Sequence, residues 1–266
     1  MLKLGWFSTG RGAGSRGLLE LVLRQITSGD LPATIEFVFQ NRECGEAEGS
    51  DQFQDMVRSY GIPLVTLSSQ RFRRERKASS FSDVRLEFDR EVIHLLEEYH
   101  PDLCALAGYM LILGPELDRK FTAINLHPAL PRGPTGTWQQ VIWKLIERRA
   151  PDTGAMIHLA TDNLDRGPAI TYYSFPLRSP LFDPLWEQIK GRTVEDLRAT
   201  EGEQLPLFQR IRQEGVKREP YLLVETIRTF AEGTVRVVDG QVVDPAGNTI
   251  RCYHLNKEIE AALGDR

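Results

Sequence analysis

Cysteine is scarce in this chain of 266 residues, and so are long apolar runs and any surplus of positive charge. The three cysteines, Cys44, Cys104 and Cys252, stand far apart and form no CxxC pair, which argues against a zinc site and a disulfide framework. Such a sparse, odd set is typical of a reducing compartment. The formal net charge of −4 provides no general attraction to nucleic acid or to acidic membranes.

No stretch of the sequence reaches the length needed to span a bilayer. The opening segment, residues 1–12 (MLKLGWFSTGRG), is apolar over too few residues for a signal peptide or an anchor. We therefore expect a cytoplasmic protein with neither membrane nor nucleic-acid partners. A hydrophobic content of 41% with 26% charged residues is ordinary for a globular protein. The length suits one large domain, alone or with a smaller appendage.

Short apolar runs alternate with amphipathic stretches over most of the chain. Strands are predicted at residues 2–8, 33–41, 62–67, 103–110, 122–127, 154–161 and 169–177. Helices are predicted at residues 18–26, 50–61, 82–102 and 137–149. Ser50 or Asp51 is expected to cap the second of these helices, and Pro101 to end the third. The alternation predicts an α/β fold with a Rossmann-like, doubly wound and mostly parallel sheet, whose ligands bind at the carboxyl ends of the strands.

The C-terminal part of the chain has a different character. Residues 182–232 are predicted to be helical, and residues 234–253 alternate around Asp239-Gly240, a strong β-hairpin signal. We therefore expect a catalytic domain over residues 1–233 and a hairpin extension over residues 234–266. The hairpin could add to the edge of the sheet or form a dimer contact; because an exposed β-edge favours pairing, we expect the tail to contribute to a homodimer.

Glycines gather directly after the first strand, in residues 9–17 (TGRGAGSRG). A glycine-rich turn before a helix presents free N–H groups and the positive end of the helix dipole, which suits phosphate. Gln40-Asn41 stands where NAD binding would favour an acidic residue. We expect phosphate binding here rather than a nicotinamide cofactor, with a purely structural turn as the alternative. The basic run at residues 71–77 (RFRRERK) is expected to be a solvated loop, with phosphate binding as the less favoured alternative.

An amide and an imidazole stand two residues apart within residues 123–133 (AINLHPALPRG). Asn125 and His127 would project from the same face of an extended segment. Pro128 and Pro131 prevent the segment from continuing as a regular strand or helix. An amide can donate to a developing oxyanion, and histidine can move a proton near neutral pH. Each would be unremarkable alone, but the pair at the end of a strand is a candidate site.

A loop with two carboxylates, residues 161–168 (TDNLDRGP), follows the next strand. Asp162 and Asp165 are compatible with a turn that serves structure alone. A carboxylate folded back onto His127 would instead raise the pKa of the imidazole and order nearby water. Both interpretations stay open at this point.

Three runs, taken in order, resemble the folate-dependent formyltransferase family: LAGYMLIL at 106–113, NLHPALP at 125–131 and GAMIHLATDNLDRGPAI at 154–170. The similarity covers roughly residues 2–175 and is greatest with the branch that formylates glycinamide ribonucleotide in purine synthesis. The resemblance implies the formyltransferase fold. It also implies transfer of a formyl group from 10-formyltetrahydrofolate, as co-substrate, to the amine of a small phosphorylated substrate, without a metal.

The resemblance further implies roles for individual residues. Asn125 would donate to the formyl oxygen, and His127 would stabilise the oxyanion or move the proton. Asp165 would orient His127 and a water, and His158 would support the site at its edge. The folate pocket would use Met110, Leu111, Ile112, Leu113, Thr161 and Asp162. The phosphorylated acceptor would contact Gly12, Ala13, Gly14, Ser15, Arg85 and Glu219.

Several departures from the family bear on the identity of the acceptor. The glycine-rich turn is longer than usual, Ala129 replaces a usual serine, Leu111 stands where arginine is frequent, and residues 178–215 are longer and more helical. The acceptor therefore stays open among glycinamide ribonucleotide, another small amine such as an amino sugar nucleotide, and water, as in a formyltetrahydrofolate hydrolase. A non-catalytic nucleotide or folate binder on the same fold is a further alternative. The three catalytic candidates argue against it, because a pure binder needs no proton-transfer site.

Overall fold

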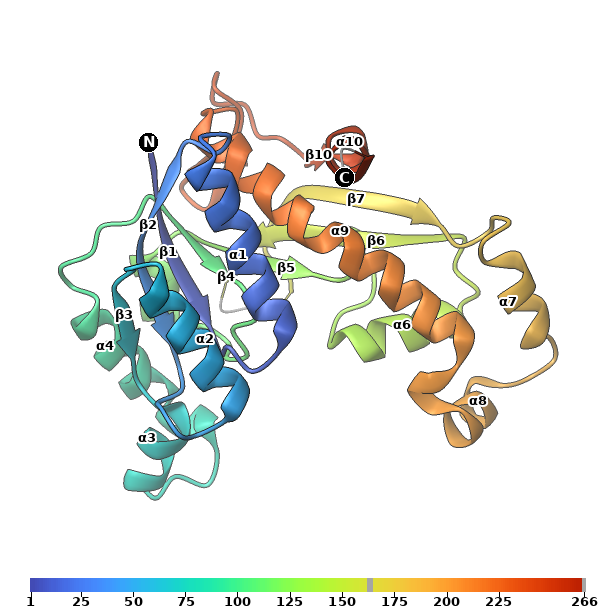
Figure 1. The fold of residues 1–266 in the computed structure, drawn as a ribbon, viewed down its shortest axis with the longest axis horizontal. Helices are drawn as coiled ribbons and strands as arrows, with labels where there is room; N and C mark the ends of the chain where they lie inside the picture. Colours follow the sequence, from blue (N-terminus) through green and yellow to red (C-terminus); the bar gives the residue numbers. More distant parts are fainter. Residues whose placement is uncertain (162–164, 265–266) are drawn as a thin grey trace. The chain divides into compact units, whose positions relative to one another are not determined.

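The computed structural model describes residues 1–161 and 165–264 (Figure 1). The chain forms two compact units. The first comprises Met1–Asn125, His158–Pro168 and Ile227–Thr249, and the second comprises Leu126–Ile157, Ala169–Thr226 and Ile250–Arg266. Three elements pass from one unit to the other: β5 (Ala123–His127), β6 (Asp152–Leu159) and α9 (Pro206–Ala231).

The first unit is built on a parallel sheet in the order β5-β4-β1-β2-β3. Besides β5, its strands are β1 (Leu2–Ser8), β2 (Ala33–Gln40), β3 (Leu64–Thr66) and β4 (Leu103–Leu106). Each of these pairings is parallel, and Trp6 is in register with Val38 on one side and with Ala105 on the other. The strand order reverses direction between β1 and β4, the arrangement in which ligands bind beyond the carboxyl ends of the strands. This confirms the doubly wound, mostly parallel fold.

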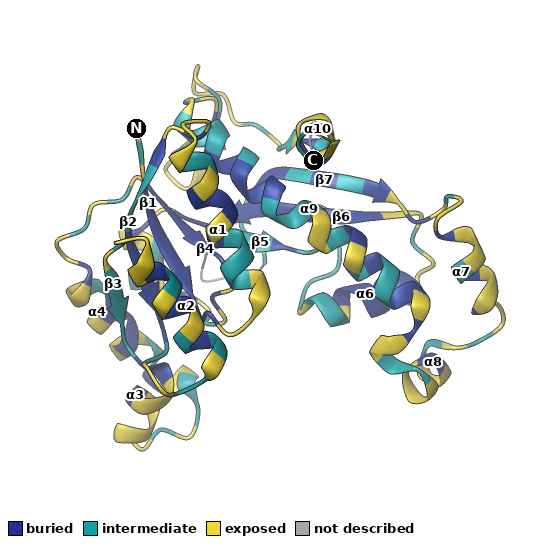
Figure 2. Cartoon of the chain, viewed as in Figure 1, coloured by how far each residue is buried: buried dark blue, intermediate teal, exposed yellow. Residues whose placement is uncertain are grey.

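Apolar side chains of this sheet are covered by helices. Phe7, Phe37 and Phe39 form one buried cluster with Phe88 of α4 (Arg85–Leu95) and Leu117 of α5 (Pro115–Lys120). Helices α1 (Ala13–Thr27) and α2 (Glu48–Ser59) lie in front of the strands in the view of Figure 1. Figure 2 shows β1 and β2 buried along most of their length, whereas the outer sides of α1 and α2 are exposed. The first unit therefore has the layered core of an α/β protein.

The second unit is built around β7 (Ala169–Pro176), which lies between β6 and β10 (Tyr253–His254). The Leu177 N–H donates to the Pro151 carbonyl at 2.8 Å, so β6 and β7 run antiparallel. The helices of this unit are α6 (Trp138–Glu147), α7 (Asp183–Gln188), α8 (Val194–Thr200) and α10 (Asn256–Gly264), together with most of α9. Thr137 and Gln140 form a capping box that starts α6, each side chain accepting from the other's backbone N–H.

The predicted C-terminal hairpin is confirmed. Its strands are β8 (Arg236–Val238) and β9 (Gln241–Val243), which pair antiparallel. Asp239 and Gly240 have φ of 50° and 71°, as a two-residue turn of this kind requires. Among the described residues, no helix is both long and apolar enough to cross a membrane.

Two predicted helix boundaries are wrong. Helix α2 begins at Glu48, so neither Ser50 nor Asp51 caps it. The Ser50 hydroxyl instead donates to the Thr9 carbonyl at 3.1 Å, inside the protein. Helix α4 ends at Leu95, well before Pro101, because the chain already turns at Leu96, which is buried in the core.

Three further predictions need correction. The basic run at 71–77 is not a loop: most of it forms α3 (Ser69–Glu75), where the Ser68 hydroxyl caps the helix and Phe72 is buried. The fourth strand is shorter than predicted, because β4 ends at Leu106 and the chain then forms a loop. The helical stretch expected at 182–232 is broken into α7, α8 and α9 by turns.

Candidate functional site

Asn125, the middle residue of β5, lies beside His158 of β6 in the first unit. Asn125 Nδ2 is 3.2 Å from His158 Nε2, and His158 Nδ1 is 2.7 Å from the Leu159 carbonyl oxygen. Because a carbonyl oxygen only accepts, Nδ1 carries the ring proton, and Nε2 of the neutral ring accepts from the amide. This pairing determines which way the Asn125 amide points, and the amide keeps a second N–H for another acceptor.

Asp165 approaches the same imidazole nitrogen. Its Oδ1 lies 3.9 Å from His158 Nε2, with side-chain exposures of 7% and 2% for the two residues. The separation is too long for a hydrogen bond, but a carboxylate at this distance would stabilise a protonated ring. Asp165 is itself a turn residue and has φ of 55°, in the left-handed region. Asn125, His158 and Asp165 therefore form one polar group, the Asn125 cluster.

His127, the last residue of β5, is buried in the second unit. Its Nε2 lies 2.8 Å from the Pro134 carbonyl oxygen, so Nε2 carries a proton and donates it to that carbonyl. The following loop is held by two more bonds, from Gly133 N–H to the Leu130 carbonyl and from Lys144 Nζ to the Thr135 carbonyl. The sequence drew attention to Pro128 and Pro131, but the carbonyl that holds the ring belongs to Pro134. No local pattern signals it.

The segment expected to bind folate is the loop that follows β4. Leu113 is buried and Leu111 packs partly against the same core, whereas Met110 and Ile112 are 71% and 38% exposed. The Met110 N–H donates to Thr9 Oγ1 at 3.0 Å, which ties the loop to the end of β1. Two of the four apolar side chains thus anchor the loop, and two are available to a ligand.

Asp89 of α4 holds the far end of this loop, a role that sequence reasoning missed. Its Oδ2 accepts from the Gly114 N–H at 2.7 Å, and the residue is 2% exposed. Burial raises the pKa of Asp89 to about 6, against the Gly114 N–H and the Arg85 charge, which both lower it. The sequence did contain a signal for this role, because Asp89 is an acidic residue next to the core position Phe88 and three residues before the core position Val92.

The glycine-rich turn leads directly into α1. Gly12 is the N-cap residue, and no side chain caps the helix. Gly12, Ala13 and Gly14 are exposed, so the first N–H groups of a long helix face solvent. Ser15 lies against Gly108, whose lack of a side chain makes room for the hydroxyl. The turn thus has the open backbone donors that a phosphate requires.

The other acceptor candidates lie apart in the chain. Arg85 is the first residue of α4, where its charge acts on Asp89. Glu219 of α9 lies in the second unit with 13% of its side chain exposed, and its Oε1 is 2.7 Å from Arg212 Nη1. Burial raises the pKa of Glu219, although the Arg212 charge lowers it.

A cavity of about 20 Å³, room for one water-sized group, adjoins this pair and is lined by Pro128, Trp138, Tyr173, Arg212 and Glu219, among others. The Arg212 guanidinium lies 4.7 Å from the centre of the Trp138 ring, a cation–π contact. Glu219 therefore lines the same cavity as Pro128, the residue that follows His127.

Thr161 is half-buried just after β6, and Asp162 lies outside the described residues. Over residues 1–161 and 165–264, no group of three or more histidine, cysteine or acidic side chains is placed to hold a metal ion.

Solved structures share this α/β fold. The phosphoribosylglycinamide formyltransferase of Coxiella burnetii superposes with a TM-score of 0.66 at 20% identity, over 95% of this chain and 98% of the other. The glycinamide ribonucleotide transformylase 1 of Symbiobacterium toebii has a TM-score of 0.64 at 23% identity, over 92% and 94%. The sheet and its helices thus define a protein of the formyltransferase fold.

Sequence comparison identifies the family. The formyl transferase family matches residues 12–178, which is more than half of the chain. The phosphoribosylglycinamide formyltransferase of Escherichia coli is 30% identical over 169 residues, 62% of this chain and 70% of the relative. The formyltetrahydrofolate deformylase of the same species is 28% identical over 162 residues, 59% of this chain and 53% of the relative. This chain belongs to the formyl transferase family, as its motifs predicted.

Proposed function

We propose that this protein is an enzyme that transfers the formyl group of 10-formyltetrahydrofolate to the amine of glycinamide ribonucleotide. The observation that carries the proposal is the Asn125–His158 pair, in which the Asn125 amide donates one N–H to His158 Nε2 and has a second N–H for a ligand. A positioned donor of this kind stabilises an oxyanion. The pair lies within the residues that match the family.

The chemistry is a single displacement. The acceptor amine attacks the formyl carbon, and the carbonyl oxygen becomes an oxyanion that accepts the second N–H of Asn125. His127 takes the proton that the amine loses and returns it to N10 of the folate as the bond from carbon to N10 breaks. Asp165 is proposed to order His127 and a water.

The remaining candidates are proposed to bind the two substrates. Folate would pack on Met110 and Ile112, the exposed side chains of the loop that Thr9 and Asp89 anchor. The phosphate of the ribonucleotide would accept from the first N–H groups of α1, at Gly12–Ser15, and Arg85 is proposed to supply a cation to the same phosphate. Glu219 would contact the rest of the acceptor. The proposed steps involve no metal.

A formyltetrahydrofolate hydrolase is the second candidate. The Glu219 side chain is only 13% exposed and already paired with Arg212, so its carboxylate has less capacity to hold an amine. If Glu219 does not serve an acceptor, water remains as the nucleophile. A relative named formyltetrahydrofolate deformylase supports this alternative.

The test is the rate of tetrahydrofolate formation from 10-formyltetrahydrofolate, with glycinamide ribonucleotide and with water alone. We expect rapid turnover only with the ribonucleotide. Equal rates in both assays would replace the proposal by hydrolysis. Folate binding without turnover in either assay would direct the search to other amines.

The roles are tested by His127→Ala and Asp165→Asn. We expect each to lower kcat by about 10²- to 10⁴-fold while the dissociation constant of the folate changes little. His94→Ala is the matched control, because His94 is an exposed histidine of α4. Turnover near the parent level in either test variant would contradict the proposed roles.

A further inference from the structure

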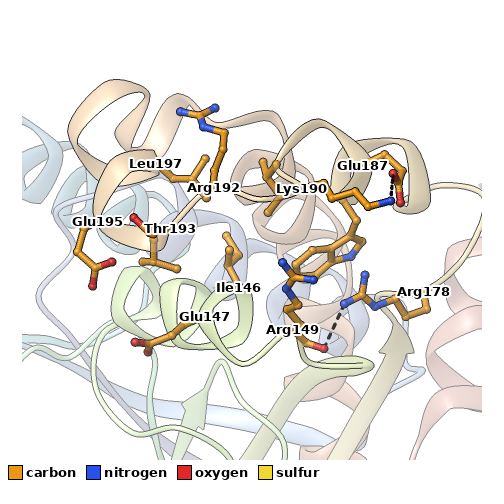
Figure 3. A pocket seen from close by; sticks show the side chains of 13 residues that line it. Ile146, Glu147, Arg149, Arg178, Glu187, Lys190, Arg192, Thr193, Glu195 and Leu197 are labelled. Atoms are coloured by element: carbon orange, nitrogen blue, oxygen red, sulfur yellow. Dashed lines mark hydrogen bonds and ion pairs between the residues drawn. The ribbon is translucent and has the colours of Figure 1, made fainter.

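The second unit contains a pocket of about 310 Å³ between the end of α6 and the helices α7 and α8 (Figure 3). Its floor consists of the buried side chains Ile146, Trp186, Ile189 and Leu197. The volume lies at the lower end of the range for small-molecule sites. Helices α7 and α8 come after residue 178, where the family match ends, and none of the lining residues has a role in the proposed formyl transfer.

Two guanidinium groups lie at one end of the pocket. Arg178 lies 4.0 Å from the centre of the Trp186 ring, and its Nη2 donates to the Arg149 carbonyl at 3.2 Å. The indole is itself held, since its N–H donates to the Leu177 carbonyl at 2.6 Å. Arg178 is therefore pre-organised, and its guanidinium keeps further N–H donors for an anion. The exposed Arg149 side chain lies beside it and has no ion pair within the part of the chain that the structure describes.

Two carboxylates lie at the opposite end. Figure 3 shows Glu147 and Glu195 across the pocket from Arg149 and Arg178, with Ile146 between them. Both glutamates are exposed, and neither has an ion pair among residues 1–161 and 165–264.

The other cations of the pocket are already neutralised. Lys190 Nζ lies 3.0 Å from Glu187, and Arg192 Nε lies 2.8 Å from Asp196. The pocket therefore presents uncompensated charge of opposite sign at its two ends, over an apolar floor.

We propose that this pocket binds a small zwitterion of the ω-amino acid class. The anionic group is held by Arg149 and Arg178, the ammonium or guanidinium group by Glu147 and Glu195, and the apolar chain lies over Ile146. A simple anion or a simple cation gains attraction at one end and loses it at the other, so a ligand with both charges fits better. The proposal does not depend on the formyl acceptor.

The test is calorimetric titration of the full chain, at physiological salt, with three probes of equal chain length. These are 6-aminohexanoate, hexanoate and hexylamine, which carry both charges, the anion alone and the cation alone. We expect 6-aminohexanoate to bind at least about tenfold more tightly than either of the others, because it makes charge-assisted bonds at both ends.

Single substitutions test which charged group of the ligand binds at each end of the pocket. Arg149→Gln and Glu147→Gln are each expected to weaken 6-aminohexanoate binding about tenfold, with no loss of hexylamine binding in the first and none of hexanoate binding in the second. Arg149 and Glu147 are exposed, so their replacement leaves the floor intact. Arg148→Gln is the matched control, since Arg148 is the exposed neighbour of Arg149 and does not line the pocket.

Three results would overturn the proposal. The first is no measurable binding of 6-aminohexanoate to the unmodified chain. The second is equal binding of hexanoate, which would mean that the acidic end contributes nothing. The third is an effect of Arg148→Gln as large as that of Arg149→Gln, which would reveal general surface charge instead of a site.

Discussion

The buried carboxyl of Asp89 makes the stability of the first unit depend on pH in a direction that can be calculated. Burial raises the pKa of Asp89 from 3.8 to about 6 in the folded protein. The folded state therefore holds one more proton than the unfolded chain between these two values. Stability falls as pH rises from about 4 to about 6 and then stays level, because above pH 6 the carboxyl is ionised in both states.

Asp89→Asn removes this dependence while it retains the hydrogen bond. The amide oxygen can accept from the Gly114 N–H as the carboxyl does. A shift of two pKa units corresponds to about 3 kcal/mol, and solvent screening reduces this to about 2 kcal/mol. We expect the variant to be about as stable as the parent at pH 4 and about 2 kcal/mol more stable at pH 7.

The assay is urea unfolding of the parent and of Asp89→Asn at intervals from pH 4 to pH 7.5. The free energy of unfolding of the parent is subtracted from that of the variant at each pH, so that the contributions of all other titrating groups cancel. Glu116→Gln is the control of opposite sign, because the Arg90 ion pair lowers the pKa of Glu116. That variant should lose stability relative to the parent as pH rises to about 4.5 and stay level above it, so its series is extended down to about pH 3. A difference for Asp89→Asn that stays flat, or that moves in the same direction as Glu116→Gln, would refute the reasoning.

Two further predictions concern backbone strain and assembly. Gly10 has φ of 68°, and a side chain there would press on Gln40 and Phe53, so Gly10→Ala should lower the free energy of unfolding by about 2 kcal/mol. Gly29→Ala, with φ of 84° and open space around it, should cost about 1 kcal/mol, and equal losses would rule out the clash. The homodimer expected through the C-terminal hairpin is tested by light scattering of Val238→Lys, which changes an exposed apolar residue of β8. An unchanged mass would exclude that edge as the contact.

The elements that could be predicted from the sequence are those whose formation depends on local sequence pattern. The alternation of apolar runs located the strands of the first unit, since the sheet is buried and each strand is short and apolar. The turn at Asp239-Gly240 was predictable because its conformation strongly favours these residue types. Helix α3 was not, because its arginines resemble a solvated loop and only the burial of Phe72 favours the helix.

The candidate site also has features that local sequence pattern predicts and others that it does not. Asn125 and His127 were identifiable from residue type and spacing, but no sequence pattern reveals the acceptors that hold the rings of His127 and His158. Leu159 and Pro134 act through backbone carbonyls, whose positions depend on how a strand and a loop close. Backbone acceptors are available at every residue, so sequence alone does not show which one a ring will meet.

The Arg212–Glu219 pair is the place to test whether the formyl acceptor is an amine or water. A carboxylate that is largely buried and paired can recognise a polar group only if the ligand replaces or shares its partner, because an unpaired buried charge is costly. Glu219→Gln leaves Arg212 without its carboxylate, so a general structural role would lower stability. An acceptor role would instead raise the KM for glycinamide ribonucleotide and leave the formation of tetrahydrofolate in water unchanged. The sensitivity of KM to this one carboxylate therefore distinguishes an amine-directed enzyme from a hydrolase with the same fold.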